Sequence, residues 1–494
     1  MWIADIPSVD AVAAAEALAA LPDLAFLDSA MHHDTLGRTS TLAADPFGRF
    51  RCRDGVATLD GRNLPGSGLE ALRACLAPYR TARDPDLPDF AGGAIGYVAY
   101  DLGAALERVA PPARRAGLCD DIAFNLYDTV LSIDHATGRC RLLATGFPET
   151  DPAAREARAR ARLAQFTRLL AEARPSPAPA AQGPLEWRSN FSQAAYEAAV
   201  ERVRAYIRAG DIYQANIAQR FEADLPEGFD PLKLYRRLRA TNPSTFGAYL
   251  DFGPLRIASS SPERFLKLSG RAIETRPIKG TVRRVADPEA DARLGEALQA
   301  NPKERAENIM IVDLLRNDLS RICEPHSVRV PVLCGLESYA SVHHLVSVVT
   351  GTLKPGLDAL DLIAATFPGG SITGAPKLRA MDIITEIEGD ARELYCGAIG
   401  ALGFEGDLDT AIAIRTVFMD ARTAVLQAGG GVTLLSEPGP EYEETLTKAA
   451  RVFQAFEPEA FVPEAFVPEA FVPEAFEPEA FEPDARGSGT GRAP

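Results

Sequence analysis

Short alternating runs of hydrophobic and polar residues dominate this 494-residue chain, and a few longer segments have helical spacing instead. The alternating runs predict strands at 26–29, 39–42, 121–127 and 129–133, and a small-residue strand pair over 90–100. The helical spacing predicts an Ala-rich helix over 8–21 that Ser8 caps, an exposed helix over 151–173 and a helix over 192–209. Strands and helices follow one another without a regular strand–helix–strand rhythm. The pattern therefore predicts an α+β fold with largely antiparallel sheets.

Two low-complexity segments divide the chain. Residues 175–187 are rich in Pro and Ala and predict a linker between an N-terminal region, 1–174, and a second region, 188–456. Six near-copies of Ala-Phe-(Val/Glu)-Pro-(Glu/Asp) then begin at Ala455. Proline at every fifth position forbids a continuous helix, so we expect residues 457–494 to be a disordered acidic tail. Drift of a simple repeat explains this tail, and recognition of its Phe residues by a partner protein is the alternative.

Charge and cysteine usage exclude several classes of function. The formal net charge is −16, and nine of these negative charges lie within 455–484, so a nucleic-acid partner is not expected. No apolar run approaches the ~20 residues of a membrane-spanning helix, and no secretory signal opens the chain. Seven cysteines without a CxxC spacing indicate reduced thiols in a cytoplasmic enzyme.

Two strands and a tight turn precede the stretch around which the chain is organised. Residues 264–268 and 271–275 predict a hairpin that Ser269-Gly270 closes, because Gly tolerates the positive φ of such turns. In that register Leu266 lies opposite Ile273. The hairpin brings the residues just before it close to the residues just after it.

Those flanking residues include an acid and an amine. Glu263 precedes the hairpin, and Lys279 follows it with Gly280 and Thr281, where a backbone approaches a ligand closely. Strict alternation places the two charged side chains on opposite faces, but a bend at Pro277 would turn Lys279 back. A carboxyl and an amine beside a Gly turn suit acid catalysis with an amine nucleophile. The alternative is an ordinary surface salt bridge.

Three motifs together extend the pattern to a known family. Pro277–Thr281 reads PIKGT, residues 367–377 read FPGGSITGAPK, and residues 428–431 read AGGG. From Asn190 to Phe456 the chain resembles the chorismate-utilising enzymes, which implies antiparallel sheets packed in a sandwich with helices outside. Within this family, a lysine in the PIKGT motif resembles the sequences of aminodeoxychorismate synthases, component I. Anthranilate synthases usually carry alanine at that position.

Acidic side chains at helical spacing are the candidate metal ligands. Glu441, Glu444 and Lys448 lie on one helical face, and Glu307 opens a second, largely apolar helix. Carboxylate oxygens suit Mg²⁺, and the resemblance implies that Glu307 and Glu444 ligate it with Glu441 close behind. A solvated Glu–Lys face is the alternative.

Candidate substrate contacts are spread over several motifs. Arg415 ends an apolar strand, where its guanidinium can grip a carboxylate in two places. The resemblance implies that Tyr395, Arg415, Gly431 and Lys448 contact substrate carboxylates, and that His344 and Ser371 lie near the ring. Thr281 and Gln214 complete the set.

The resemblance implies a reaction with chorismate. Glu263 would protonate the C4 hydroxyl as it leaves, and Lys279 would add at C2 before ammonia adds at C4 and expels it. Water-adding isochorismate synthases carry a lysine base where this chain has Gln214. The product would be 4-amino-4-deoxychorismate, a precursor of 4-aminobenzoate and folate. The chain also lacks a Gly-x-Cys-x-Gly loop, so a separate glutamine amidotransferase subunit would supply the ammonia.

Two alternatives remain at this stage. An anthranilate synthase large subunit is separated from the first hypothesis by Lys279. A non-catalytic chorismate-binding scaffold would predict loss of the acidic residues, but Glu263, Glu307 and Glu444 are all present. The family's tryptophan feedback motifs are matched only in part at 27–29 and 242–246, so feedback inhibition is not expected.

Overall fold

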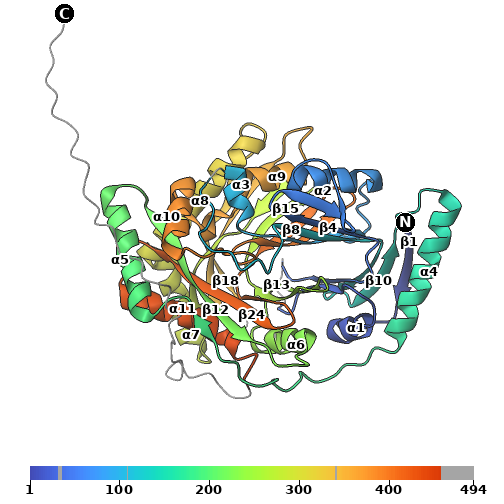
Figure 1. Cartoon of the computed structure of the whole chain (residues 1–494), viewed down its shortest axis with the longest axis horizontal. Coiled ribbons are helices and arrows are strands. Elements are labelled where there is room, and N and C mark those ends of the chain that lie inside the picture. Colours follow the sequence, from blue (N-terminus) through green and yellow to red (C-terminus); the bar gives the residue numbers. More distant parts are fainter. Residues whose placement is uncertain (32–35, 108, 340–341, 458–494) are drawn as a thin grey trace, which may run out of the picture.

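Two large antiparallel sheets stack face to face and form the centre of the molecule (Figure 1). The computed structural model describes residues 1–31, 36–107, 109–339 and 342–457. The predicted acidic tail, 457–494, lies outside these residues except for Glu457. Within these residues each sheet has twelve strands, and the pairs between named strands are antiparallel. The α+β sandwich that the sequence predicts is confirmed.

The first sheet carries the N-terminal strand at one edge. In spatial order it contains β1 (Trp2–Ile6), β10 (Arg139–Ala144), β9 (Thr129–Asp134), β3 (Thr39–Ala43), β2 (Ala25–Asp28), β13 (Phe246–Asp251), β14 (Arg256–Ser261), β23 (Thr416–Met419), β24 (Thr423–Val432), β12 (Gln214–Asp224) and β11 (Arg188–Ser189), with β20 (Gly374–Ala375) paired to β12.

The second sheet carries the hairpin region at one edge. Its order is β17 (Ile278–Arg283), β19 (Val342–Thr352), β16 (Ala272–Thr275), β15 (Arg264–Ser269), β22 (Leu408–Ile412), β21 (Ala398–Gly403), β7 (Gly93–Val98), β8 (Ile122–Tyr127), β4 (Gly48–Arg53), β5 (Val56–Leu59) and β6 (Arg62–Asn63), with β18 (Arg329–Ser338) paired to β19.

Helices cover the outer face of each sheet. The first sheet packs against α1 (Ala11–Leu18), α4 (Pro152–Ala171), α5 (Gln193–Ala209), α6 (Pro231–Thr241), α10 (Lys377–Glu388) and α11 (Pro438–Phe453). The second packs against α2 (Gly68–Leu76), α3 (Leu102–Glu107), α8 (Pro302–Ile322) and α9 (Ala359–Thr366). The remaining helices are α7 (Pro288–Ala300), η1 (Ala77–Tyr79) and η2 (Gly370–Ile372). No helix in the described ranges is both long and apolar enough to cross a bilayer.

Strands from both sides of the predicted linker share each sheet. β2 pairs with β13 in the first sheet, and β7 pairs with β21 in the second. Residues 175–187 form no helix or strand, and α6 holds them through hydrogen bonds from Arg236 to the Pro177 carbonyl and from Arg237 to the Pro179 carbonyl. The division of the chain at this segment stays a prediction.

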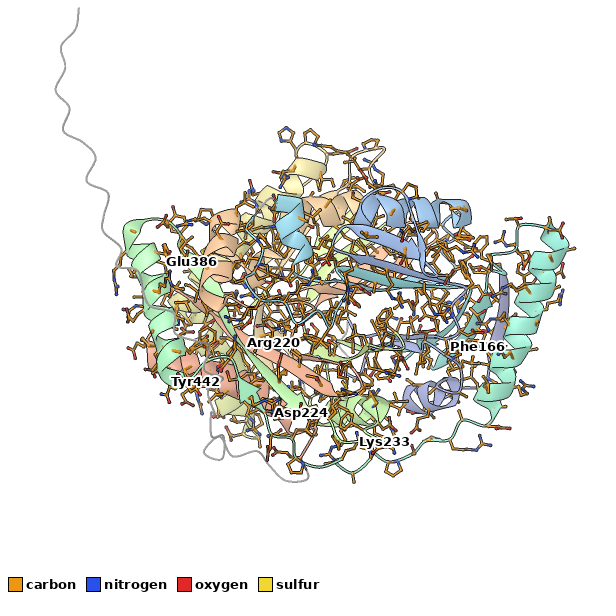
Figure 2. The ribbon with its side chains drawn as sticks, viewed as in Figure 1. Phe166, Arg220, Asp224, Lys233, Glu386 and Tyr442 are labelled. Carbon is orange, nitrogen blue, oxygen red and sulfur yellow. The ribbon has the colours of Figure 1, made fainter. Side chains whose placement is uncertain are left out.

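The helix over 151–173 is less exposed than its composition suggests. α4 buries one face against the first sheet, and Phe166 on that face is fully buried (Figure 2). Arg162 and Arg158 of α4 both reach the buried carboxylate of Asp128, where the chain crosses from β8 in the second sheet to β9 in the first. Arginine stems can cover apolar surface, which is why an Arg-rich helix still packs.

Three local predictions were wrong. Asp10, rather than Ser8, caps α1, because its carboxylate accepts hydrogen bonds from the amides of Val12 and Ala13. The segment 90–100 contains one strand, β7, rather than a pair, because its partners β8 and β21 come from elsewhere in the chain.

The third error concerns the hairpin register. The β15–β16 hairpin forms, but Ser269 pairs with Ala272 and Leu268 pairs with Ile273. The loop is therefore Gly270-Arg271. Gly270 has φ 60°, and a single positive φ at the first of two loop residues is the position that Gly takes in such turns.

Candidate active site

Lys279 owes its direction to an irregularity in an edge strand. β17 pairs with β19 at Ile278–Val346 and again at Thr281–His344, which leaves one extra residue in β17 between these pairs. Bulges at sheet edges redirect side chains, and Gly280 supplies the positive φ, 83°, at this one. The sequence predicts a bend at Pro277, whereas the register changes only after Ile278.

Ser371 connects the predicted acid to the predicted nucleophile. Lys279 Nζ donates a hydrogen bond to the Ser371 carbonyl oxygen at 3.1 Å, and the Ser371 side chain hydrogen-bonds the Glu263 carboxyl. Glu263 is 6% exposed, and the backbone amide of Ile278 also hydrogen-bonds its carboxyl. The structure thus brings Glu263 and Lys279 into contact with the same residue, Ser371.

Burial shifts both titrating groups toward their neutral forms. It raises the pKa of Glu263 to about 7, against the opposing effects of Ser371, Lys279 and the Ile278 amide. It also lowers the pKa of Lys279, although the nearby charges of Glu307 and Glu263 act in the other direction. A neutral carboxyl can donate a proton and a neutral amine can attack carbon, so the pair suits an acid and a nucleophile.

Gln214 and Gly431 line the space in front of this amine. Asn216 of β12 pairs with Gly431 of β24, and Gln214 is 1% exposed at the start of β12. A Cβ at Gly431 would lie 2.0 Å from Gln214 Nε2 and 3.7 Å from Lys279 Nζ. Gln214 Oε1 is buried without a protein partner among the described residues. An unpaired acceptor beside an amine is expected where a ligand completes the hydrogen bonding.

The acidic residues gather at the end of β24. A Cβ at Gly430 would lie 3.1 Å from Glu441 Oε2 and 3.5 Å from Glu444 Oε1. Lys448 forms an ion pair with Glu444 at 2.7 Å and donates to the Gly429 carbonyl at 2.8 Å, so the predicted helical face of α11 is present. Glu307 of α8 lies near enough to Lys279 for its charge to act on that amine.

These acids fit a hard cation in their chemistry. The described residues contain no group of three His, Cys, Asp or Glu side chains already arranged around a metal position. Glu441 Oε2, however, is buried and has no hydrogen-bond partner within the described chain, and burial raises the pKa of both Glu441 and Glu307. A buried carboxylate oxygen without a partner is what a bound Mg²⁺ would satisfy.

His344, Thr281 and Arg415 form a further group of predicted substrate contacts. Thr281 Oγ1 and His344 Nδ1 are 2.8 Å apart. Burial, with the positive charge of Arg415, lowers the pKa of His344 to about 3, so the imidazole is neutral. Burial lowers the pKa of Arg415 to about 10, and its φ of 51° is a conformation that non-Gly residues seldom adopt. This cation acts on both Glu263 and His344.

A buried ion pair beside Tyr395 escaped the sequence analysis. Arg392 is 1% exposed, forms an ion pair with Glu388 at 2.6 Å, and lies 5.7 Å from the ring of Tyr395. Its guanidinium donates to the carbonyl oxygens of Ile372 and Asn216. It therefore links the loop of Ser371 to the strand of Gln214. The spacing of Glu388 and Arg392, four residues apart, was the signal in the sequence that could have indicated this ion pair. Such pairs usually lie on helix surfaces, so the spacing alone does not predict burial.

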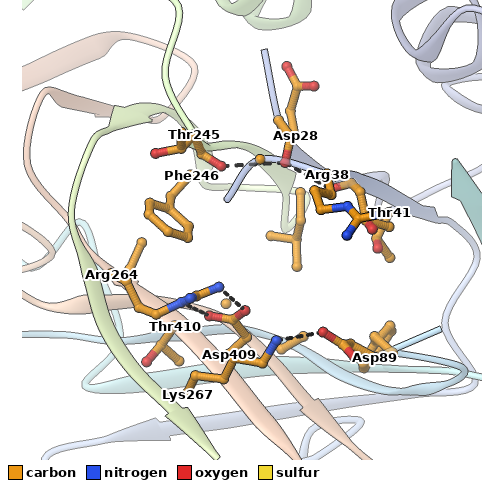
Figure 3. Close-up of a pocket in the computed structure, with 18 of the residues that line it drawn as sticks. Asp28, Arg38, Thr41, Asp89, Thr245, Phe246, Arg264, Lys267, Asp409 and Thr410 are labelled. Atoms are coloured by element: carbon orange, nitrogen blue, oxygen red, sulfur yellow. Dashed lines mark hydrogen bonds and ion pairs between the residues drawn. The ribbon is translucent and has the colours of Figure 1, made fainter. Parts of the chain in front are cut away.

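A separate cavity of about 480 Å³ opens between the two sheets, lined by none of the predicted catalytic or metal-binding residues (Figure 3). Two ion pairs lie within its lining. Arg264 pairs with Asp409 at 2.9 Å and Lys267 with Asp89 at 2.6 Å. Leu27–Ser29, one of the partial feedback motifs, lines its wall.

Comparison with known proteins finds relatives along most of the chain. The sequence profile of the chorismate binding enzymes matches residues 27–454. Aminodeoxychorismate synthase component 1 of Klebsiella aerogenes is 42% identical over 76% of this chain and 79% of its own length. Anthranilate synthase component 1 of Aquifex aeolicus is 38% identical over 87% of this chain and 88% of its own length. The crystal structure of anthranilate synthase component I from Streptococcus pneumoniae has a TM-score of 0.75 and 34% identity, covering 84% of this chain and 92% of that one.

Proposed function

Because the chain belongs to the family of chorismate binding enzymes, we propose that it aminates chorismate at C4 and forms 4-amino-4-deoxychorismate. Overall similarity does not separate this activity from anthranilate formation, since relatives of both names match at comparable identity. The observation that carries the proposal is that Lys279 Nζ and the Glu263 carboxyl both hydrogen-bond Ser371.

The chain's own side chains supply the acid and the nucleophile. Glu263 protonates the C4 hydroxyl, which leaves as water while Lys279 Nζ adds at C2 and the two conjugated ring double bonds each shift by one position. Ammonia then adds at C4 and gives a proton back to the Glu263 carboxylate, both double bonds return to their first positions, and the C2–N bond to Lys279 breaks. One ammonia is consumed and one water is released, and Lys279 and Glu263 return to their starting forms.

Cations and backbone groups hold the substrate's two carboxylates. Arg415 and Lys448 are the candidate cations, and Tyr395 and the backbone at Gly431 complete the contacts. Glu307, Glu441 and Glu444 would hold Mg²⁺, which when bound neutralises the ring carboxylate. This assignment of metal ligands is supported by Glu441 Oε2, which is buried and has no hydrogen-bond partner among the described residues.

Ammonia reaches the site from a glutamine amidotransferase subunit in this proposal. All seven cysteines are free and buried, so the chain offers no exposed thiol for glutamine hydrolysis. The relatives' designation as component 1 agrees with a second component that performs it.

Product identity tests the proposal. Purified chain is incubated with chorismate, Mg²⁺ and ammonium, and the product is identified by chromatography and mass spectrometry. Aminodeoxychorismate, converted to 4-aminobenzoate by an added lyase, is the expected result. Anthranilate would overturn the assignment.

A further inference from the structure

The first copy of the C-terminal repeat is docked onto the body of the protein. Ala455 and Phe456 follow α11 and its C-cap residue Gln454, and both are 1% exposed. They open the unit Ala-Phe-Glu-Pro-Glu, which is the first of the six near-copies. The repeat therefore begins inside the folded core.

An aromatic pocket receives Phe456. Its ring lies 5.2 Å from the ring of Trp187 in an edge contact and 6.0 Å from the ring of Phe229 in a stacked contact. Trp187 also contacts Phe453, the last residue of α11, at 4.9 Å. Aromatic groupings of this kind are stabilised beyond the burial of their area, so the pocket is a built receptor for a phenyl ring.

Arg237 of α6 holds the backbone around that ring. Its guanidinium donates to the carbonyl oxygens of Ala455 at 2.8 Å, of Glu457 at 2.9 Å and of Gln454 at 3.3 Å. Figure 2 shows α6, which carries the labelled Lys233, at the same end of the first sheet as Asp224. Carbonyl groups are common to every residue, so Arg237 does not read the third position of the unit, which is Glu in some copies and Val in others.

We propose that this receptor, made of Trp187, Phe229, Phe453 and Arg237, accepts the downstream Ala-Phe units of the same chain in place of the first. Each of the five later copies repeats the Ala-Phe dipeptide that is buried in the first copy. The amide hydrogen bonds of Ala455 and Phe456 to the last turn of α11 are available only to the first copy. A later copy thus replaces most, but not all, of the anchor.

The anchored helix links this receptor to the candidate active site. α11 carries Glu441, Glu444 and Lys448 toward its start and Phe453 at its end. In this proposal the tail therefore supplies replacement Ala-Phe units that can hold the end of α11, the helix that carries these residues. This inference does not depend on which reaction the site performs.

Four full-length chains test it: the wild type, F456A, a tail variant with F461S, F466S, F471S, F476S and F481S, and the combination of both. The length and the charge of the chain are the same in all four. The tail variant should melt like the wild type. F456A should lose only a little in melting temperature, whereas the combination should lose roughly 5 °C more, since no phenyl ring is left to fill the pocket.

Equal losses for F456A with and without the tail phenylalanines would overturn the proposal. A melting temperature of F456A that rises with protein concentration, together with a doubled mass in solution, would also overturn the proposal. The occupant of the pocket would then be a second copy of the chain. Trp187 emission in a W2F background reports on the pocket directly. It should shift to the red in the combined variant and stay near the wild-type position in F456A. F456L replaces F456A if the latter does not fold.

Discussion

Lys279 Nζ donates a 3.1 Å hydrogen bond to the backbone carbonyl oxygen of Ser371, and this contact orients the amine beside Glu263. Backbone carbonyls are uncharged, so the contact positions the amine without fixing it as an ammonium ion. Burial then lowers the pKa of Lys279 and raises that of Glu263. Position and protonation state are therefore set by the same enclosed site.

The pH dependence of kcat/KM follows from these two groups. Glu263 must be protonated, so its reactive fraction falls as pH rises through about 7, whereas Lys279 must be neutral, so its reactive fraction rises with pH. We expect a bell-shaped profile with one limb near pH 7. E263Q should lose that limb and roughly 10²-fold or more in rate. A limb near pH 7 that survives in E263Q would assign it to another group.

The same carboxyl makes stability depend on pH. The folded chain keeps the Glu263 proton up to about pH 7, whereas the unfolded chain releases it near the ordinary glutamate pKa of 4.5, so folding stability falls as pH rises across this window. E263Q has no such proton. The free energy of unfolding of both chains is measured in urea at both ends of the window. The difference between E263Q and the wild type should grow by roughly 3 kcal/mol in favour of E263Q from the low-pH end to the high-pH end. Parallel curves for the two chains would contradict a buried, neutral Glu263.

Gly431 is expected to be required for space rather than for flexibility. In G431A the new methyl group would lie 2.0 Å from Gln214 Nε2. Gln214 must then move, and we expect it to occupy the space in front of the Lys279 amine. Activity should fall by about 10²-fold, and Q214A should restore part of it in the double variant. G439A on α11 is the matched control, because its Cβ would lie 3.8 Å from the Glu197 carboxylate. A double variant no better than G431A would show that the clash is not the cause.

Removal of divalent cations should abolish activity with chorismate. EDTA-treated chain should regain its rate with added Mg²⁺, and E441Q should require a higher Mg²⁺ concentration, because one hard oxygen donor is replaced by an amide. The half-saturating Mg²⁺ concentration in the ammonium-dependent assay measures this. Identical Mg²⁺ curves for E441Q and the wild type would remove Glu441 from the metal site.

The sequence predicts an α+β fold with antiparallel sheets and the proximity of Glu263 to Lys279 because both depend on local signals. Alternation gives the strands, and the hairpin between Glu263 and Lys279 is continuous in the chain. Its register was wrong by two residues because one loop glycine is compatible with either closure. The direction of Lys279 depends on a bulge against β19, a strand more than sixty residues later, and no local pattern encodes that pairing.

Contacts between distant segments account for what sequence reasoning missed. Arg392 meets Asn216 and Ile372 only after three separate elements have folded together. Likewise, Phe456 reads as one repeat phenylalanine among six until Trp187 and Phe229 form its pocket. Contacts with residues distant in the sequence, rather than composition, set the position of the first repeat copy.

The most direct test of the account is the mass of the intact chain after mixing with chorismate and Mg²⁺ in the absence of ammonia. A covalent nucleophile predicts an adduct with the mass of chorismate less one water, located at Lys279 by peptide mapping and lost when ammonium is added. K279A should form no adduct and no aminodeoxychorismate, while K267A, which removes the lysine paired with Asp89, should behave like the wild type. Turnover by K279A at the wild-type rate, or an adduct on another residue, would contradict the role of Lys279.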